Sequence, residues 1–248
     1  MTFIYEGHLM KFTFTDDQDY LAKYINKNKT FFEQSFLRYL RDHKIITRDS
    51  VVIDIGACIG NHTVYFSKII GARKIISIEP TLRSFEVLQR NIELNDINNV
   101  ICKHVAISSS KGLAQCYPRK LGHIGSNRWV PIGPNVEPLI GPGGQTYNVD
   151  AIKNNETVET VLLADIVNEK IDFIKMDVED AENIIIESGS DVIREYKPIL
   201  MVEVSKYNLK KFEYLMKDLN YVPIGESVFT KNRFKKANTL LYKCGRNQ

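Results

Sequence analysis

The stretch VVIDIGACIGNHTVYF (residues 51–66) changes character halfway along its length. Its first five residues are β-branched apart from Asp54, which is typical of a buried strand. The residues after Gly60 fit a helix, so Gly56 and Gly60 stand in the turn between the two patterns. In open parallel sheets ligands bind beyond the carboxyl ends of the strands, where glycine lets the backbone approach them closely. The stretch therefore predicts a strand, a turn and a helix, with the turn either binding a ligand or making a plain tight connection.

Short β-branched runs alternate with helical patterns from Val51 onward. This alternation is the signature of strand-helix-strand units on a parallel sheet. We predict strands at 51–55, 74–79, 100–106, 171–178 and 198–204, and a closing pair in YVPIG and NTLLYK. Helices are predicted at about 61–70, 82–95, 181–194 and 207–219. An earlier helix is expected after Thr30, because Thr30 and Glu33 suit a capping box.

Residues 107–165 interrupt this rhythm, because they are too long for a strand-to-helix connection. The runs LAQCYP, NRWVPI and TVETVLL have β character and are expected to form hairpins beside the main sheet. The stretch PIGPNVEPLIGPGGQTYN between them is typical of a functional lid or a disordered segment. We predict one domain over 1–248, with an amino-terminal extension (1–49), a cofactor-binding core (50–205), this insert as the acceptor lid, and a carboxyl-terminal helix and strands (206–248).

Composition excludes several classes of protein. The 33 basic and 30 acidic residues nearly balance, so the whole chain gives no argument for nucleic acid or an anionic membrane. The segment from Lys206 to Arg246 is locally basic, which indicates a docking surface or a solvated helix face. The four cysteines show no metal-ligand spacing and read as reduced thiols. No apolar run has the length of a membrane span and no signal peptide is evident, so a soluble, cytoplasmic protein is expected.

The turn and the second strand together indicate a nucleoside-bearing cofactor. Glu79 ends the second strand, where an acid would reach both hydroxyls of a ribose. The spacing Gly56-x-x-x-Gly60 lacks the three-glycine fingerprint of a dinucleotide site. Asp54 suits the ammonium group of an amino acid better than a pyrophosphate. These features point to S-adenosylmethionine.

The sequence resembles the FkbM family of S-adenosylmethionine-dependent methyltransferases over about residues 50–205. The resemblance rests on VVIDIGACIGNHTVYF, IISIEPTLRSFEVLQRNIELN, AIS and IDFIKMDVEDAENIIIESGSDVIREYKPILMVEV. It implies a class I methyltransferase fold, an α/β Rossmann-like sheet of seven mostly parallel strands with helices on both faces and the last strand antiparallel. It also implies O-methylation, commonly of sugars in surface glycans or of secondary metabolites. The candidate cofactor-binding residues are Asp54, Gly56, Ala57, Gly60, Asn61, Glu79, Pro80 and Ala106.

The family usually reads D-V-E-G-A-E where this chain reads D-V-E-D-A-E, from Asp177 to Glu182. Asp180 therefore stands at a position where glycine could adopt a positive φ that Asp tolerates less well. The candidate catalytic residues are Asp177, Glu179 and His62. Asp177 is favoured because an acid ending a buried strand is costly without a task.

Other readings of the same residues stay open. Glu203 ends another strand and is an equal candidate for function or structure, while Glu182 and Glu179 could simply favour a helix amino end. His62 could serve as a base near pH 7 or bond to backbone, and Asn61 could cap its helix. Phe31, Phe32 and Glu33 could cover the cofactor or belong to the core.

Methyl transfer to a hydroxyl requires that donor and acceptor be aligned and that one proton be removed. Nothing in the spacing calls for a metal. In the insert, Tyr117, Trp129 and Tyr147 suit stacking on a sugar or packing in a hairpin. We expect a sugar or glycan acceptor. The alternatives are a secondary metabolite, nucleic acid held by the basic carboxyl end, or a binding module without catalysis.

Overall fold

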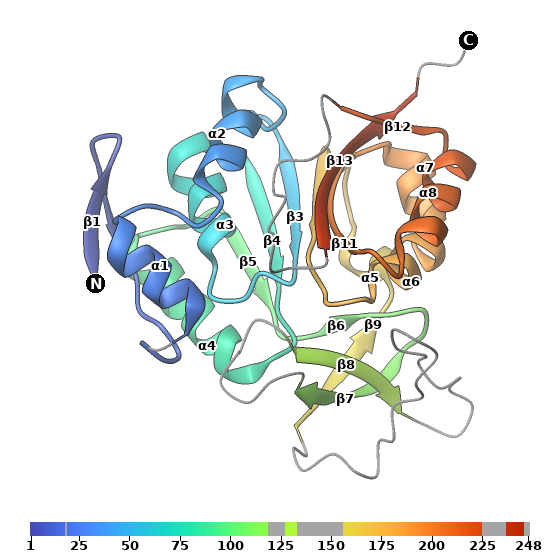
Figure 1. The fold of residues 1–248 in the computed structure, drawn as a ribbon, viewed down its shortest axis with the longest axis horizontal. Helices are drawn as coiled ribbons and strands as arrows, with labels where there is room; N and C mark the ends of the chain where they lie inside the picture. The colour runs from blue at the N-terminus through green and yellow to red at the C-terminus, as the bar shows by residue number, and fades with distance from the viewer. Residues whose placement is uncertain (18, 119–126, 133–155, 225–236, 246–248) are drawn as a thin grey trace.

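Seven strands form the main sheet, in the order β12-β13-β11-β10-β3-β4-β5 (Figure 1). The computed structural model describes residues 1–17, 19–118, 127–132, 156–224 and 237–245. The five strands from β11 to β5 in this order are parallel, whereas β13 runs antiparallel to both β11 and β12. The predicted seven-stranded, mostly parallel sheet with an antiparallel last strand is therefore confirmed. The strands are β3 (Val51–Ile55), β4 (Lys74–Ile78), β5 (Val100–Lys103), β10 (Phe173–Met176), β11 (Ile199–Ser205), β12 (Tyr221–Pro223) and β13 (Ala237–Cys244).

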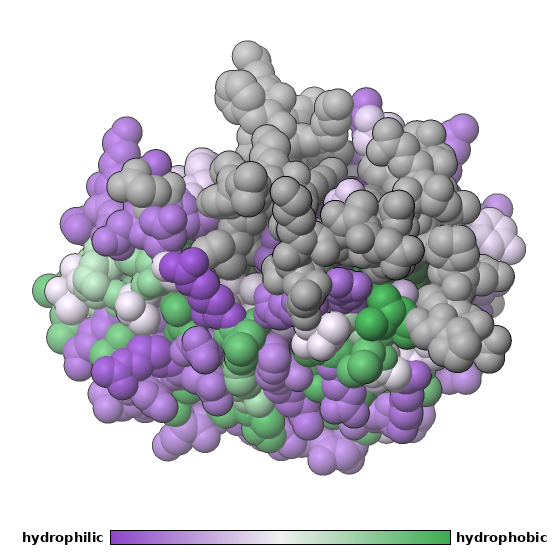
Figure 2. Space-filling model, turned by 90° about the horizontal axis from the view of Figure 1, so that it is seen from below, coloured by the Kyte–Doolittle hydropathy of each residue, from purple (hydrophilic) through white to green (hydrophobic). Residues whose placement is uncertain are grey.

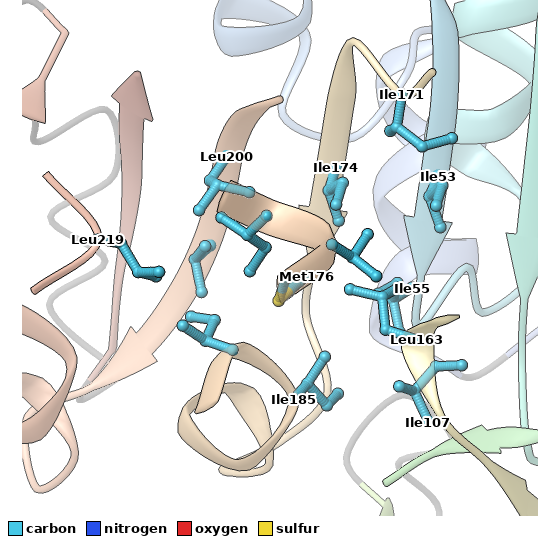
Figure 3. Close-up of a cluster of buried hydrophobic side chains, with 14 of the residues drawn as sticks. Ile53, Ile55, Ile107, Leu163, Ile171, Ile174, Met176, Ile185, Leu200 and Leu219 are labelled. Atoms are coloured by element: carbon cyan, nitrogen blue, oxygen red, sulfur yellow. The ribbon is translucent and has the colours of Figure 1, made fainter. Parts of the chain in front are cut away.

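Helices cover both faces of this sheet. Side chains alternate between the faces of a strand, so Ile53 and Ile55 of β3 pack on one side and Val52 on the other. Figure 3 shows the first side, where Ile174 of β10 and Ile185 of the following helix join the same cluster. That side carries α5 (Leu163–Ile166), α6 (Glu182–Ser188), α7 (Ser190–Tyr196) and α8 (Leu209–Asp218).

The opposite face is covered by the amino-terminal part of the chain and by the helices that connect β3, β4 and β5. The aromatic side chain of Phe31 is fully buried there, in edge contact with Tyr5 and Tyr65, so the core reading of Phe31 fits. The elements on this side are β1 (Thr2–Tyr5), β2 (His8–Lys11), α1 (Tyr20–Asn28), α2 (Gln34–Asp42), α3 (Asn61–Tyr65), the π-helical turn η1 (Phe66–Ile70) and α4 (Leu82–Leu94).

The predicted capping box at Thr30 and Glu33 is wrong. Glu33 is itself the N-cap of α2, with a left-handed φ of 57° and no side-chain cap bond. Its carboxylate lies 3.2 Å from Nε2 of His62 instead. The Glu33 side chain therefore makes a tertiary contact with α3, and it does not cap α2 as the local pattern predicted.

The predicted helix over 181–194 is two helices, α6 and α7, that meet at Gly189. A Cβ at Gly189 would lie 2.7 Å from Cδ2 of Leu163 and 2.8 Å from the carbonyl oxygen of Ile185. Close packing against α5 thus explains a glycine at this junction.

The insert contains a second sheet of four strands in the order β6-β9-β7-β8, which lies beyond the carboxyl ends of β3 and β4 (Figure 1). These strands are β6 (Ala106–Ile107), β7 (Gly112–Pro118), β8 (Asn127–Ile132) and β9 (Thr157–Val161). β7 pairs antiparallel with β8 and β9, which confirms the predicted β character of the three runs. Most of the Pro/Gly-rich stretch, with Tyr147, lies outside the described residues.

The surface on the side of the small sheet mixes polar and apolar residues over the part that is coloured in Figure 2. Within the described ranges, no helix combines the length and the apolar character that crossing a membrane requires. The basic segment Lys206–Arg246 is described only in part, because residues 225–236 and 246–248 lie outside the described ranges.

Replacing Gly56 by Ala should destabilise the protein more than replacing Gly7. Both glycines have positive φ, 75° and 84°, but a Cβ at Gly56 would overlap the carbonyl oxygen of Asp177, whereas nothing lies within 4 Å at Gly7. We expect Gly7→Ala to cost about 1–2 kcal/mol of unfolding free energy for its left-handed backbone. Gly56→Ala should cost about 1–3 kcal/mol more for the overlap. Urea unfolding measures both, and equal losses would contradict the close approach.

Candidate functional site

A cavity of about 330 Å³ lies where the carboxyl ends of β3, β4 and β10 meet the small sheet. The chain runs outward from β3 through β4 to β5 and returns at β10, so the strand order reverses between β3 and β10. Ligands of open α/β sheets bind at such a reversal. The volume is at the lower end of the range for small-molecule sites. The wall comprises residues from both sheets and from the loops that follow β3, β4, β10 and β11, among them Gly56, Glu79, Pro80, Ala106, Arg128, Trp129, Asp177, Glu179, Asp180, Tyr207 and Asn208.

The glycine turn forms one wall of the cavity. The amides of Gly56 and Ala57 both donate to the carbonyl oxygen of Ile78, at 2.9 and 3.0 Å, which joins the turn to β4. The space beside Gly56 is filled by the backbone of Asp177, and a Cβ at Gly60 would lie 2.7 Å from Cδ1 of Leu88. The two glycines thus satisfy contacts within the protein, in addition to any approach of a ligand.

Glu79 follows β4 and has its carboxylate fixed by backbone amides. Its Oε2 accepts from the amide of Cys58 at 2.9 Å and its Oε1 from that of Thr81 at 2.8 Å. Burial raises the pKa of Glu79, and these two amides act against that rise. Each carboxylate oxygen has a second lone pair, so the group can still accept hydrogen bonds from two ribose hydroxyls. Pro80 and Ala106 line the same cavity.

Asp54 lies below the turn and outside the cavity wall. It is fully buried, and its Oδ1 is 3.1 Å from Nζ of Lys175, which is its register partner on β10. Its Oδ2 accepts from Oγ1 of Thr63 at 2.7 Å. The carboxylate that the sequence offers to a cofactor ammonium therefore makes a buried ion pair in this structure.

Lys175 is a residue of the site that the sequence analysis missed. Its Nζ also donates to the carbonyl oxygen of Gly56 at 2.6 Å, so it holds the turn from beneath. Burial lowers its pKa, but the charges of Asp54 and Asp177 outweigh this and the pKa is raised overall. The available signal was a lysine inside the apolar run IDFIKMDV, because a buried charge requires a partner.

His62 and Asn61 hold the amino-terminal segment. Asn61 exchanges two hydrogen bonds with the backbone of Phe32, at 2.9 and 3.2 Å. The His62 ring pairs with Glu33 and stacks on Phe66 at 6.0 Å between ring centroids. Neither His62 nor Asn61 is part of the cavity wall.

The turn after β10 brings Asp177 and Glu179 to the cavity. Glu179 and Asp180 have φ of 53° and 83°, so the position where the family usually has glycine does adopt a positive φ. The Asp180 side chain forms an ion pair with Arg128 of the insert and accepts from Nδ2 of Asn208 at 3.2 Å. Arg128 and Asn208 are two further residues that the sequence analysis missed. Glu203 on β11 and Tyr117 on β7 do not line the cavity, whereas Trp129 does.

Glu182 supports this turn from below. Its Oε1 accepts from the amides of Val178 and Asp180, both at 3.3 Å, and the residue is 1% exposed. Burial raises its pKa to about 8, against the effect of backbone hydrogen bonds and with the help of the charges of Asp177 and Asp180. Glu182 therefore shapes the turn from the amino end of α6.

No group of three or more His, Cys, Asp or Glu converges on a metal position anywhere in the described ranges. The cavity has two features of an organic cofactor site. Its place at the strand-order reversal and the fixed carboxylate of Glu79 fit a nucleoside. A sheet of this order with this site is the class I methyltransferase fold.

The chain belongs to the FkbM family of methyltransferases. The methyltransferase FkbM domain matches residues 54–245, which is most of the chain. The protein is accordingly an enzyme that uses S-adenosylmethionine as its cofactor. No curated protein matches the sequence.

Solved structures agree on the fold. An FkbM methyltransferase from Methylobacillus flagellatus KT gives a TM-score of 0.54 at 18% identity, over 80% of this chain and 44% of that one. This chain thus spans less than half the length of that protein. An rRNA methylase from Streptococcus thermophilus gives 0.50 at 10% identity, over 86% of this chain and 95% of that one. Identities this low bear on the fold alone.

Replacing Lys175 by Met should leave the Asp54 charge buried without its partner. Removing one member of a buried pair costs about 3–5 kcal/mol of unfolding free energy. The double variant Asp54→Asn with Lys175→Met should recover most of that loss, which urea unfolding measures. Lys74→Met on β4 is the control, because its pair with Glu169 is partly exposed and worth about 1 kcal/mol or less. Equal losses for Lys175→Met and Lys74→Met would contradict the structural role of the buried pair.

Replacing Glu182 by Gln should change the pH dependence of stability. An acid whose pKa rises on folding binds more protons in the native state, so it destabilises the fold increasingly from about pH 4.5 to pH 8. We expect the advantage of Glu182→Gln over the parent to grow by at least about 1.4 kcal/mol across this window. Thermal and urea unfolding at several pH values measure it. Exposed Glu86→Gln is the control, and a difference that stays constant with pH would refute the assignment.

Proposed function

We propose that the enzyme transfers the methyl group to a hydroxyl of a sugar or glycan. The observation that supports this most directly is the pairing of Trp129 with the carboxylates of Asp177 and Glu179 in one cavity wall. An aromatic ring offers an apolar face to the C–H face of a sugar, and carboxylates accept hydrogen bonds from its hydroxyls. Among the described residues, Nε1 of Trp129 is buried and makes no hydrogen bond, so its donor capacity is unused.

S-adenosylmethionine, when bound, supplies a methyl group on a positively charged sulfur. The chain's own task is then to orient the acceptor hydroxyl and to remove its proton. Alignment is the larger contribution, at about 7–11 kcal/mol of the barrier. We assign the cofactor ribose to Glu79, with Gly56, Pro80 and Ala106 around it, whereas Ala57 packs in the core behind the turn. Asp54 and Asn61 contribute indirectly, through Lys175 and through the amino-terminal segment.

Asp177 is the first candidate for the base that takes the hydroxyl proton, and Glu179 is the second. Both line the cavity, whereas His62 is paired with Glu33 away from its wall. A positioned base typically contributes a factor of about 10²–10⁴. The proposal therefore gives His62 a structural task and the two carboxylates the chemical one.

The alternatives are a secondary metabolite without a sugar and a nucleic acid. The described carboxyl-terminal lysines give nucleic acid little support, since Lys211 pairs with Glu187 and Lys206 lies over the Tyr207 ring. Among the described residues, four carboxylates and one arginine line the cavity, which opposes entry of a phosphate. Sugar hydroxyls meet no such repulsion.

The deciding experiment supplies labelled S-adenosylmethionine with glycan, RNA and small-molecule fractions of the native host. We expect label in the glycan fraction and a methylated monosaccharide after acid hydrolysis, identified by mass spectrometry. Transfer should persist at about 200 mM salt, whereas a binder of several phosphates loses affinity steeply there. Label found in RNA, or in a metabolite without a sugar, would refute the proposal.

Asp177→Asn should lower kcat by about 10²-fold or more and change the dissociation constant for S-adenosylmethionine little, because an amide keeps the shape but cannot take a proton. Glu179→Gln should have a smaller effect on kcat. Steady-state kinetics and calorimetry measure these, with exposed Glu187→Gln as the control. If Asp177→Asn keeps the parental kcat while Glu179→Gln loses it, the base is Glu179 and this assignment is wrong.

A further inference from the structure

Arg128 of β8 and Asp180 of the turn after β10 join the insert to the main domain. Their side chains form an ion pair and are 10% and 14% exposed. Both residues line the cavity, so the pair is part of the wall that faces the acceptor. A charge pair this sheltered from water is screened less than one on the surface.

β8 requires an attachment of this kind because of its place in the small sheet. It is the last strand in the order β6-β9-β7-β8, and it pairs with β7 on one side. Within the described ranges no strand pairs with its other side. An edge strand held by one neighbour can open unless another contact fixes it.

Asp180 adopts a backbone conformation that is unfavourable in free energy, so its presence at this position requires an explanation. Its φ of 83° is a left-handed conformation that glycine adopts more readily than Asp. The carboxylate is nevertheless held on two sides, by Arg128 and by Nδ2 of Asn208 at 3.2 Å. A strained residue that persists at a cavity wall indicates a task for its side chain.

We propose that the Arg128–Asp180 ion pair is a latch that docks β8 on the turn bearing Asp177 and Glu179. Trp129 follows Arg128 directly, so the latch sets where the aromatic wall stands relative to the two carboxylates. Arg128 and Asp180 are thus positioning residues for the acceptor side. This last step depends on the proposed function, whereas the docking of β8 does not.

Hydrogen exchange tests the latch without any acceptor. Losing the pair should make the amides of residues 127–130 and 132 exchange about tenfold faster, which corresponds to about 1.4 kcal/mol. We expect this in Arg128→Gln and in Asp180→Asn, which tolerates positive φ. The double variant should exchange no faster than the single ones, and exchange in β3 should not change. Arg73→Gln, which breaks an exposed pair with Glu169, is the matched control.

The variant Asp180→Gly distinguishes loss of the latch from a general loss of stability. Glycine relieves the left-handed backbone, so the melting temperature should not fall, yet β8 should exchange faster and Trp129 should become more accessible to acrylamide. Trp129 is the chain's single tryptophan, so its fluorescence reports on β8 directly. Unchanged exchange in the single variants would overturn the latch, and so would a roughly hundredfold effect in the double variant, since independent effects multiply.

With an identified acceptor, the variants should raise its KM several-fold and leave the dissociation constant of S-adenosylmethionine unchanged. Arg128→Lys should restore part of the loss, because it keeps the charge. If the acceptor proves not to be a sugar, the proposed function fails while the exchange results still decide the latch. If exchange in β8 does not respond, the latch fails whatever the acceptor is.

Discussion

The buried ion pair between Asp54 and Lys175 supports the glycine turn of the candidate site from beneath. Its two members stand side by side on β3 and β10, the strands between which the order of the sheet reverses. Neither charge could remain in that interior alone, so each requires the other. Lys175 also donates to the carbonyl of Gly56, and Asp54 accepts from Thr63 of α3, so one pair joins two strands, the glycine turn and a helix. The glycine turn is therefore held by electrostatics as well as by backbone shape.

The turn after β10 depends on the glycine turn that this ion pair supports. Gly56 leaves space for the carbonyl of Asp177, so the loops that follow β3 and β10 pack closely against each other. Glu182 holds the same loop from below through the amides of Val178 and Asp180. From above, Arg128 reaches Asp180 and connects the insert. The cavity is thus built by successive contacts from the sheet interior outward to the small sheet of the insert.

Most strands and helices of the main domain could be predicted, because buried parallel strands and amphipathic helices leave distinct periods in the sequence. The failures fall where tertiary contacts override local patterns. Glu33 has the right spacing for a capping box, but it pairs with His62 instead. The helical pattern divides at Gly189, where Leu163 packs too closely for any side chain. Local sequence propensity does not encode either of these tertiary contacts.

The sequence by itself determined the strand-helix alternation, the glycine turn, the acid at Glu79 and the acidic run from Asp177, since each is written in consecutive residues. Only the tertiary structure decided which charges meet. Asp54 pairs with a lysine on a strand far along the chain, and Asp180 with an arginine in an insert 52 residues away. Such pairs follow from strand register and from how two sheets dock, and neither property is encoded in a local period. For that reason Lys175 and Arg128 were visible in the sequence as residues but not as partners.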